Sequence, residues 1–430
     1  MSQIQIAADK PIANSFQTPI IIQCGNVWDG CAEGSLGPME ILVQDGKIAD
    51  MDRKVGRPDG AKVIDLSKRT VTPGFTDCHA HMTFGRMAFA GFFTLSQAQI
   101  LLKSLKWLRQ TLFEGFTTVR DVGTSFLWNF LTIDMRDAIN QGIIIGPRMI
   151  VAPHAFTSTG GHGDMSNSMS YEVYSSLRLA SIVDGPDAIQ KAVRANIKGG
   201  ADWIKCTGTG GFVSPTSDPG VPTFTQEEMN ILVATAHDQR IPVAVHAYGD
   251  EGVRRALIAG VESIEHGNMA SIEAMKMMEK KGTFMVPTQF CFEDALVNLN
   301  NKAYWDAQPI WIYRKMAKYA PEIIECAKNL AESNVKIAFG TDAGTFPTPP
   351  DTTNTWREFP TMVKNGISPL RALKAATSTA AELLRRPDLG TLTVGKTADI
   401  IAMPGDPFLD INVTGKVDFV MKEGMIYRQP

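Results

Sequence analysis

The sequence predicts an α/β protein, a (β/α)8 TIM-type barrel with a small composite β-sandwich domain formed from both chain ends. Three observations lead to this prediction. Eight short apolar runs in the middle of the chain alternate with longer stretches of helical periodicity. Both chain ends instead carry short β-like runs separated by Gly and Asp turns. The length of 430 residues accommodates one such barrel with an attachment.

The two chain ends are expected to pair into one sheet domain. Residues 19–71 read as antiparallel hairpin material with a turn at 44–46, and residues 389–430 read the same way with a turn at 422–424. Neither segment has room for a long helix. The predicted boundaries are residues 1–72 and 386–430 for the small β-sandwich domain and residues 73–385 for the barrel.

The barrel prediction depends on the number of β-like runs, because eight parallel strands close a (β/α)8 barrel. Helical segments fall between the runs: Leu95–Glu114 has apolar residues at helical spacing, and Ser368–Leu384 begins with Ser-Pro, a suitable N-cap and first helical residue. The runs are Thr72–Cys78, Phe116–Asp121, Arg148–Ala152, Asp202–Cys206, Pro242–His246, Glu262–Glu265, Thr283–Pro287 and Lys336–Gly340.

Composition and charge narrow the class of function. The chain is 44% hydrophobic and 20% charged, and its net charge of −3 gives no basic surface for nucleic acid or membrane. The six cysteines are scattered without a CxxC pair, and the N-terminus lacks the pattern of a signal peptide. We therefore expect a cytoplasmic homo-oligomer that acts on a small molecule.

Metal-capable side chains occur where several of the predicted strands end. His79 and His81 close the first run two positions apart, so both imidazoles face the same side of a strand and can hold one metal ion. In a barrel of this kind, the active site is built at the C-terminal ends of the strands. The other residues at such ends are Lys205, His246, His266 and Asp342.

Each of these residues alone is a weak signal. A single histidine at a strand end is usually structural, and an Asp after Gly-Thr can simply cap the next helix. Together these residues are a stronger signal for a metal site than any one of them. Four of the seven histidines in the chain occupy predicted strand ends of the same barrel. Imidazole and carboxylate ligands suit zinc and its neighbours without thiolates.

Lys205 requires a separate argument, because a protonated ammonium repels a metal ion. Burial in a barrel mouth disfavours the charged form of lysine. The neutral amine can then react with carbon dioxide to form a carbamate, an anionic ligand with two oxygens that is able to bridge two cations. Otherwise Lys205 is an ordinary solvated or paired lysine.

The sequence resembles the amidohydrolase superfamily over nearly its whole length. The resemblance rests on the HAH of the first run, on Lys205, His246, His266 and Asp342, and on the later segment GTLTVGKTADIIAM. The motifs GFTTVRDVG, TGGHGD, ADWIKC, HAYG, SIEHG and GTDAG are similar to the branch of metal-dependent carboxypeptidases and Xaa-Pro dipeptidases. That branch also resembles amidohydrolases that split ochratoxin-type aryl amides of phenylalanine.

The resemblance implies a binuclear site, with zinc as the expected metal. His79, His81 and Asp342 would hold the first ion and His246 and His266 the second, with carboxylated Lys205 and a hydroxide bridging the two. The implied reaction is hydrolysis of an amide or peptide bond that releases a C-terminal amino acid. Asp342 would pass the proton of the attacking water to the departing amine.

Two further residues are expected to bind the substrate. His162 lies in the Gly-rich TGGHGD loop after the third run, and Tyr248 lies two positions beyond His246. Glycine loops at a barrel mouth usually serve ligands, so His162 is assigned to catalysis and substrate binding, and Tyr248 to substrate binding. Whether His162 reads the substrate carboxylate or the scissile carbonyl stays open.

The sequence is also compatible with other functions. A deaminase or cyclic-amide hydrolase of the same superfamily is the main alternative, although such enzymes often use one metal without a carbamate. A remote alternative is a non-catalytic scaffold. Arg120 and Asp121 are expected to form a charged pair that supports the site. The run FAGFFTL (residues 89–95) is either core packing or an aromatic substrate wall.

Overall fold

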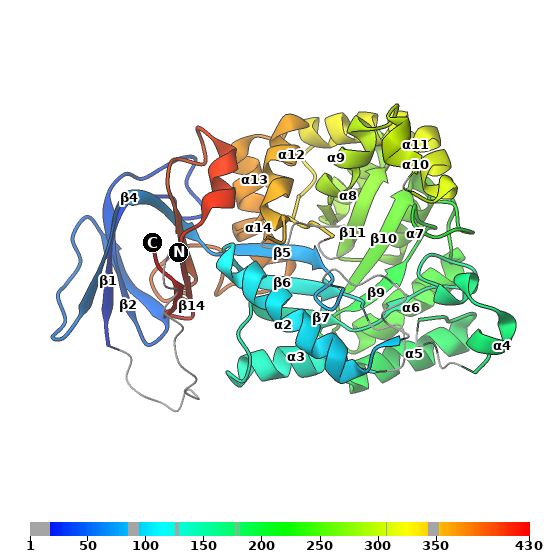
Figure 1. Ribbon diagram of the computed structural model, residues 1–430, viewed down its shortest axis with the longest axis horizontal. Helices are drawn as coiled ribbons and strands as arrows, with labels where there is room; N and C mark the ends of the chain where they lie inside the picture. The colour runs from blue at the N-terminus through cyan, green and yellow to red at the C-terminus, as the bar shows by residue number, and fades with distance from the viewer. Residues whose placement is uncertain are drawn as a thin grey trace.

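The computed structural model describes residues 18–84, 94–124, 129–176, 179, 181–306, 308–342 and 352–430. These residues form a small sheet, on the left of Figure 1, and a larger barrel with its helices on the right. The predicted fold class, a (β/α)8 barrel with a composite β domain, is confirmed. No helix in this described part of the chain is both long and apolar enough to span a bilayer.

The small sheet is assembled from both ends of the chain. Antiparallel pairing of Ile401 with Thr72 joins the C-terminal strands to the N-terminal ones. Its strands, in spatial order, are β15 (Met425–Arg428), β14 (Phe419–Lys422), β13 (Ile400–Met403), β4 (Lys62–Pro73), β1 (Ile20–Val27), β2 (Met39–Gln44) and β3 (Lys47–Asp52).

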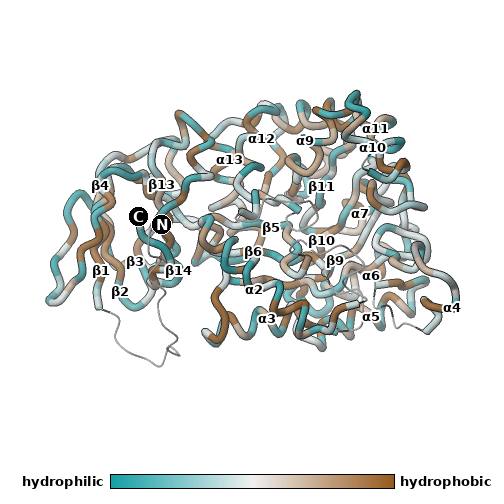
Figure 2. The backbone as a smooth tube through the Cα atoms, in the orientation of Figure 1, coloured by the Kyte–Doolittle hydropathy of each residue, from teal (hydrophilic) through white to brown (hydrophobic). Residues whose placement is uncertain are grey.

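The two halves of this sheet face each other around an apolar core. Ile22, Ile41 and Leu66 from one half meet Phe419 and Met421 from the other, and none of these side chains is more than 1% exposed. Figure 2 shows the hydrophobic stretches of β1 and β2 that supply part of this core.

Tight turns shape the hairpins as the sequence predicted. Asp45 and Gly46 have φ of 49° and 76°, and Glu423 and Gly424 have φ of 54° and 76°, which fits two-residue hairpin turns. The expected antiparallel hairpins are present, and in addition β1 pairs with β4 in parallel, with Ile22 opposite Ile64, which the sequence did not predict. Parallel pairing is possible here because the β2–β3 hairpin separates the two strands in sequence.

The barrel strands follow the predicted order with small changes at their ends. Thr72 belongs to β4 of the small sheet, and the first barrel strand begins at Phe75, after the chain passes Pro73 and Gly74. The strands are β5 (Phe75–Ala80), β6 (Phe116–Val122), β7 (Arg148–Ala152) with its short continuation β8 (Ala155–Phe156), β9 (Ile204–Thr207), β10 (Val243–Gly249), β11 (Ser263–Met269) and β12 (Phe284–Val286).

The eighth predicted run closes the barrel. Ile337 forms a parallel bridge with Met285 of β12, and on the other side the amide of Cys78 in β5 donates to the carbonyl of Phe339 at 2.8 Å. On the opposite side of the barrel, β7 is joined to the segment before β9. There the amide of Asp202 donates to the carbonyl of Val151 at 2.8 Å. All strands therefore run in the same direction around one axis, and their C-terminal ends meet at one mouth.

Helices surround the strands, as Figure 1 shows. The longer ones are α2 (Gln97–Phe113), α3 (Leu131–Asn140), α5 (Pro186–Lys198), α6 (Gln226–Asp238), α7 (Asp250–Ala259), α8 (Ile272–Lys281), α9 (Phe290–Val297) and α11 (Ile310–Glu332). The shorter ones are α4 (Tyr171–Tyr174), α10 (Lys302–Asp306), α12 (Glu358–Lys364), α13 (Pro369–Ala375) and α14 (Ser378–Leu383), with 3-10 turns at Met165–Ser168, Thr355–Arg357 and Ile411–Lys416.

Two helices form where the sequence predicted them, and one of them is divided. The segment from Leu95 forms α2, which starts with a capping box between Ser96 and Gln99. Ser368 caps α13 as predicted, with its side chain accepting from the amide of Arg371. The expected single helix from Ser368 was wrong, because Thr377 has φ of −131° and ψ of −98° and divides the segment into α13 and α14.

A buried ion pair connects the barrel to the small sheet, and it gives a test of this junction. Arg148 of β7 donates to Asp399 at 2.7 Å and to Thr118 at 2.8 Å. Removing one partner of a buried pair leaves an uncompensated charge, which costs ~3–5 kcal/mol. We expect Asp399→Ala to lower the free energy of unfolding by about 3 kcal/mol, measured from the urea midpoint, because Glu423 still contacts Arg148.

The control removes a carboxylate from an exposed pair. Lys336 and Glu382 lie 2.6 Å apart with side chains 47% and 55% exposed. Glu382→Ala is expected to cost only about 0–1 kcal/mol. An equal loss in both variants would contradict the structural role of Asp399.

Candidate metal centre

The six predicted metal ligands all lie at the barrel mouth. His79 is in β5 and His81 follows that strand, Lys205 is in β9, His246 in β10 and His266 in β11, and Asp342 follows the closing segment 336–340. The rings converge: the centroid of His266 lies 4.7 Å from that of His79 and 4.6 Å from that of His246.

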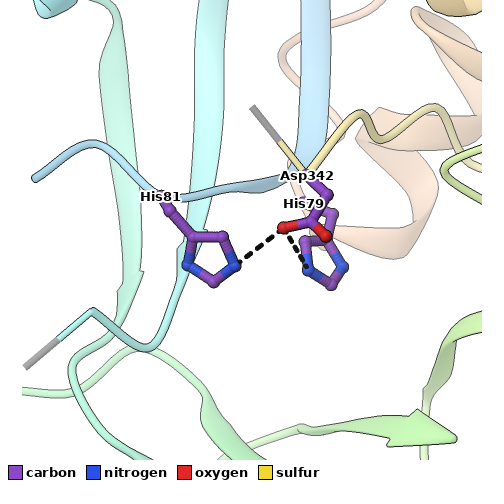
Figure 3. A group of neighbouring side chains, drawn as sticks. All are labelled: His79, His81 and Asp342. Atoms are coloured by element: carbon purple, nitrogen blue, oxygen red, sulfur yellow. Dashed lines mark ion pairs between the residues drawn. The ribbon is translucent and has the colours of Figure 1, made fainter. Parts of the chain in front are cut away.

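His79, His81 and Asp342 form one candidate metal-binding group (Figure 3). Oδ1 of Asp342 lies 3.1 Å from Nε2 of His81 and 3.8 Å from Nε2 of His79. Ligand atoms around a tetrahedral zinc ion with bonds of ~2.0–2.2 Å are about 3.3–3.6 Å apart. The spacing and the donor types of this group therefore fit a divalent cation.

Hydrogen bonds orient two of the imidazoles toward the centre. Nδ1 of His79 donates to the Glu265 carboxylate at 2.8 Å, and Nδ1 of His266 shares a hydrogen bond with the Thr288 hydroxyl at 2.7 Å. In both rings Nε2 is then the nitrogen left for a ligand position. A partner on the second nitrogen fixes the ring and its tautomer, as is usual for metal-binding histidines.

Glu265 is itself held by a buried network. Arg120 of β6 donates to Glu265 at 2.7 Å and to the carbonyl of Cys78 at 2.7 Å, and Ser263 donates to Glu265 at 2.5 Å. Arg120 and Glu265 are fully buried. The expected pair between Arg120 and Asp121 was wrong, because adjacent strand residues point to opposite faces.

Two other buried carboxylates hold the loops that carry ligands. Asp121 accepts from the amide of Met82 and from Thr124, both at 2.7 Å, next to His81. Asp77 accepts from the Thr341 hydroxyl at 2.6 Å, next to Asp342. Burial raises the pKa of Asp77 to about 7, and the hydrogen bonds from Thr341 oppose this shift.

Three residues at the mouth have left-handed backbone conformations that non-glycine residues rarely adopt. The φ angles are 68° for His266, 44° for Thr288 and 59° for Asp342. Each such residue costs of the order of 1–3 kcal/mol and is typical of functional sites. At His266 the conformation lets its ring reach the barrel interior although the preceding residue, Glu265, already faces inward.

Lys205 is buried at the centre of this cluster, and its amine has no hydrogen-bond partner among the described residues. Burial lowers the pKa of Lys205 to about 8, and the nearby Glu265 opposes the shift. A buried polar group without a partner is rare and costly. The amine therefore fits a group that is modified or that contacts a bound species.

The buried histidines are suited to be neutral ligands. Burial, together with the positive charge of Lys205, holds the pKa of His79 well below its usual value. Burial and the neighbouring rings do the same for His246 and His266. Neutral imidazole offers a lone pair to a cation at pH 7.

The predicted substrate residues both border the ligand cluster. The ring of His162 stacks on that of His246 at 4.5 Å, and its Nδ1 shares a hydrogen bond with Ser214 at 2.7 Å. Gly211 is required beside it, because a Cβ there would lie 2.2 Å from Nδ1 of His162. The ring of Tyr248 stacks on His266 at 4.7 Å.

Several residues of this neighbourhood were not predicted from the sequence. Glu265, Thr288 and Ser214 orient the histidines, and Cys291 forms a second metal-capable group with His266 and Asp342. The thiol of Cys291 donates to the carbonyl of Thr288 at 2.9 Å, and burial holds its pKa well above the usual value. A signal for Glu265 existed, namely an acidic residue inside an apolar strand. Most of the FAGFFTL run lies outside the described residues.

Comparison with known proteins defines the class of protein. Residues 70–427 match the Amidohydrolase family, so the chain belongs to that family. The chain is 29% identical over 379 residues to ochratoxinase of Aspergillus niger, covering 83% of this chain and 75% of that protein. With its hydrolase relatives, this makes the chain a hydrolytic enzyme of the amidohydrolase superfamily, as the motifs predicted.

Solved structures agree with the predicted branch. The chain is similar to a Xaa-Pro dipeptidase with methionine bound in the active site, at 36% identity and a TM-score of 0.87, covering 96% of this chain and 100% of that one. It is also similar to a prolidase complexed with N-methylphosphonate-L-proline, at 29% identity and a TM-score of 0.84, with the same coverage. Enzymes of this family generally use divalent metals, which agrees with the ligand groups described above.

The Glu265 network gives a prediction for metal affinity. Glu265→Gln keeps the shape of the side chain but removes the charge that orients His79 and offsets Arg120. We expect metal affinity to fall by ~10–100-fold, the usual effect of losing an outer-shell partner. The measurement is metal retention during titration with a chelator, followed by elemental analysis.

Glu262→Gln is the matched control, because Glu262 directly precedes β11 and binds Arg385 and His237 away from the mouth. Its metal affinity should equal that of the wild type. Unchanged metal retention in Glu265→Gln would show that the orientation of His79 does not depend on this carboxylate.

Proposed function

We propose that this protein is a binuclear metal-dependent amidase or carboxypeptidase that releases the C-terminal amino acid from a dipeptide or N-acyl amino acid. The observation that carries the proposal is the convergence of four histidines and Asp342 around the buried, unpartnered amine of Lys205. Candidate substrates are Xaa-Pro dipeptides, N-acyl amino acids and ochratoxin-type aryl amides of phenylalanine. The similarity to a Xaa-Pro dipeptidase and to ochratoxinase supports this choice.

The ligand set divides into two incomplete groups that share Lys205. His79, His81 and Asp342 would hold one cation, His246 and His266 the other, and a carboxylated Lys205 would bridge them. Zinc is the metal we propose, on the basis of the donor types. When bound, such cations supply a nucleophile at neutral pH by acidifying water and polarise the amide carbonyl.

Lys205 is proposed to be carboxylated because its environment favours the neutral amine. The lowered pKa of Lys205, about 8, leaves a reactive fraction of free amine near neutral pH. Addition of carbon dioxide to that amine gives a carbamate and releases one proton. The negative charge of the carbamate would offset the cations that the surrounding neutral imidazoles cannot balance.

Asp342 is the proposed acid and base. Its carboxylate lies between the Nε2 atoms of His79 and His81, and its left-handed backbone directs it into the mouth. From this position it would accept the proton of the attacking water and pass it to the nitrogen of the departing amine as the C–N bond breaks. General acid–base catalysis of this kind contributes ~10²–10⁴-fold.

His162 and Tyr248 are the proposed substrate-binding residues. The ring of His162 covers His246, and the ring of Tyr248 covers His266, so the two side chains flank the second ligand group. Burial lowers the pKa of His162 to about 3, which keeps the ring neutral. With Nδ1 engaged by Ser214, the neutral ring would act as a single hydrogen-bond donor or acceptor through Nε2.

A hydrolysis screen combined with metal analysis tests the proposed function. Purified protein with and without added zinc would be assayed on a Xaa-Pro dipeptide, an N-acyl amino acid, an ochratoxin-like aryl amide, a cyclic amide and an aminopurine. We expect about two metal ions per chain and release of a free amino acid from one of the first three. Turnover of only the cyclic amide or the aminopurine would refute the proposal.

Asp342→Asn serves as the inactive control in this screen. The amide keeps the size of the carboxylate but cannot transfer the proton, so activity should fall by ~10²–10⁴-fold with an unchanged circular dichroism spectrum. Residual activity above about a tenth of wild type would remove Asp342 from the proposed role.

Replacement of Lys205 tests the bridging carbamate. Lys205→Ala should lose most activity and part of its metal, because neither ligand group is complete without a shared anion. Short carboxylates such as acetate or propionate should restore part of both. The carbamate itself should appear as an added 44 Da in native mass spectrometry of the wild-type chain, by the mass of carbon dioxide. A full complement of metal in Lys205→Ala would contradict the bridge.

Replacement of His162 tests which group of the substrate this residue binds. If His162 binds the free carboxylate, His162→Ala should lower kcat/KM more for acid substrates than for their methyl esters, because the esters carry no charge. A loss of about tenfold or more on acids alone is expected, from matched acid and ester pairs. Equal losses on both would instead assign His162 to the scissile carbonyl or to loop support.

A further inference from the structure

A cavity lies outside the ligand cluster, between α9, α11 and the end of α12. Its volume is about 280 Å³, just below the ~300–1,000 Å³ typical of ligand pockets. Phe292 and Leu296 of α9 and Ile323 and Ala327 of α11 form apolar walls. The cavity is therefore large enough for one small molecule with an apolar body.

One polar side chain in this cavity needs a partner. Asn268 lies at the end of β11 and is only 5% exposed, and its Oδ1 accepts no hydrogen bond from any described residue. A buried acceptor without a donor costs ~1–3 kcal/mol. A bound molecule with an N–H or O–H group would satisfy Asn268.

The charge of the lining favours an anion. The lining includes two lysines, Lys328 and Lys364, and no Asp or Glu. Lys364 is paired with Glu293 at 2.9 Å. Lys328 is exposed and forms no ion pair with a described residue, so it is the cation left for a ligand.

We propose that this cavity is a second binding site for a small apolar carboxylate that also carries an N–H or O–H donor, of the size of one amino acid. The apolar walls would enclose the side chain, Asn268 would accept the donor, and Lys328 would attract the carboxylate. Free or N-substituted amino acids with an apolar side chain have all three features. The proposal stands on this cavity alone and does not depend on the proposed activity.

Phe292 separates this site from the ligand cluster. Its ring borders the cavity and also contacts Tyr248, at 5.6 Å between ring centroids. The cavity residue Gln289 directly follows Thr288, which fixes the ring of His266, and its side-chain oxygen accepts from Asn365 at 3.0 Å. The two sites are thus neighbours that share a wall but have different polar groups.

The experiment compares three probes by isothermal titration. L-phenylalanine has both polar groups, 3-phenylpropionate lacks the amine, and phenethylamine lacks the carboxylate. We expect Ala327→Trp, which fills the cavity from α11, to lose one L-phenylalanine site that the wild type has. The two incomplete probes should bind that site at least tenfold more weakly than L-phenylalanine.

Ala317→Trp is the matched control, because Ala317 is an exposed alanine of the same helix outside the cavity lining. It should keep the full number of sites. Identical isotherms for wild type and Ala327→Trp would overturn the proposal, and so would loss of a site in both variants.

A surface variant keeps the test decisive if Ala327→Trp does not fold. Lys328→Gln should weaken L-phenylalanine at this site several-fold and leave phenethylamine unchanged, while Arg314→Gln on the same helix changes neither. Equal weakening of both probes, or none, would reject the assigned carboxylate contact. Purely competitive inhibition of turnover by binding at this site would show that it belongs to the substrate site, which also refutes the proposal.

Discussion

The buried carboxylate of Glu265 connects the elements on which the candidate centre depends. It accepts from Arg120 of β6, from His79 of β5 and from Ser263 of its own strand. Burying a carboxylate and a guanidinium away from water costs free energy. The cost is offset only when most of their hydrogen-bonding groups have partners. Arg120 meets this condition with three acceptors, the third being Ser263 at 3.1 Å. The network therefore permits one relative arrangement of these strands, and that arrangement aims His79 at Asp342.

The geometry of parallel strands determines which residues of this site could be predicted from the sequence. The C-terminal ends of all the parallel strands of a barrel meet at one mouth, so His79, Lys205 and His246 could be grouped without knowing any contact. Glu265 stood out only as an acidic residue inside an apolar strand, and its contact with His79, like that of Thr288 with His266, depends on how the strands are staggered across the barrel. The helix break at Thr377 was also not predicted. The break is a change of backbone angles, and it leaves the helical spacing of the apolar residues unchanged.

A prediction from strict alternation of side chains along a strand would have placed His266 outside the site. Glu265 faces inward toward His79, so His266, the next residue, should face the surrounding helices. It faces inward as well, because its φ of 68° turns the chain at that point. Thr288, in the loop after β12, then holds the ring. Because of this unfavourable backbone conformation, two successive residues both point polar side chains inward. These are Glu265, whose carboxylate orients His79, and His266.

Helix α11 supports both the loop beside His162 and the cavity between α9 and α11. Lys315 of this helix donates to the carbonyls of Gly211, Ser214 and Ser217, and so fixes the loop that holds His162. About two and three turns further along, the same helix supplies Ile323 and Ala327 to the cavity wall. The two points lie on either side of Pro321, which lacks the backbone N–H that an α-helix needs for its hydrogen bond at that position. The helix therefore serves two neighbourhoods through two segments, one before Pro321 that holds the loop of His162 and one after it that lines the cavity, whereas His79 and Asp342 are fixed from β5 and the closing segment.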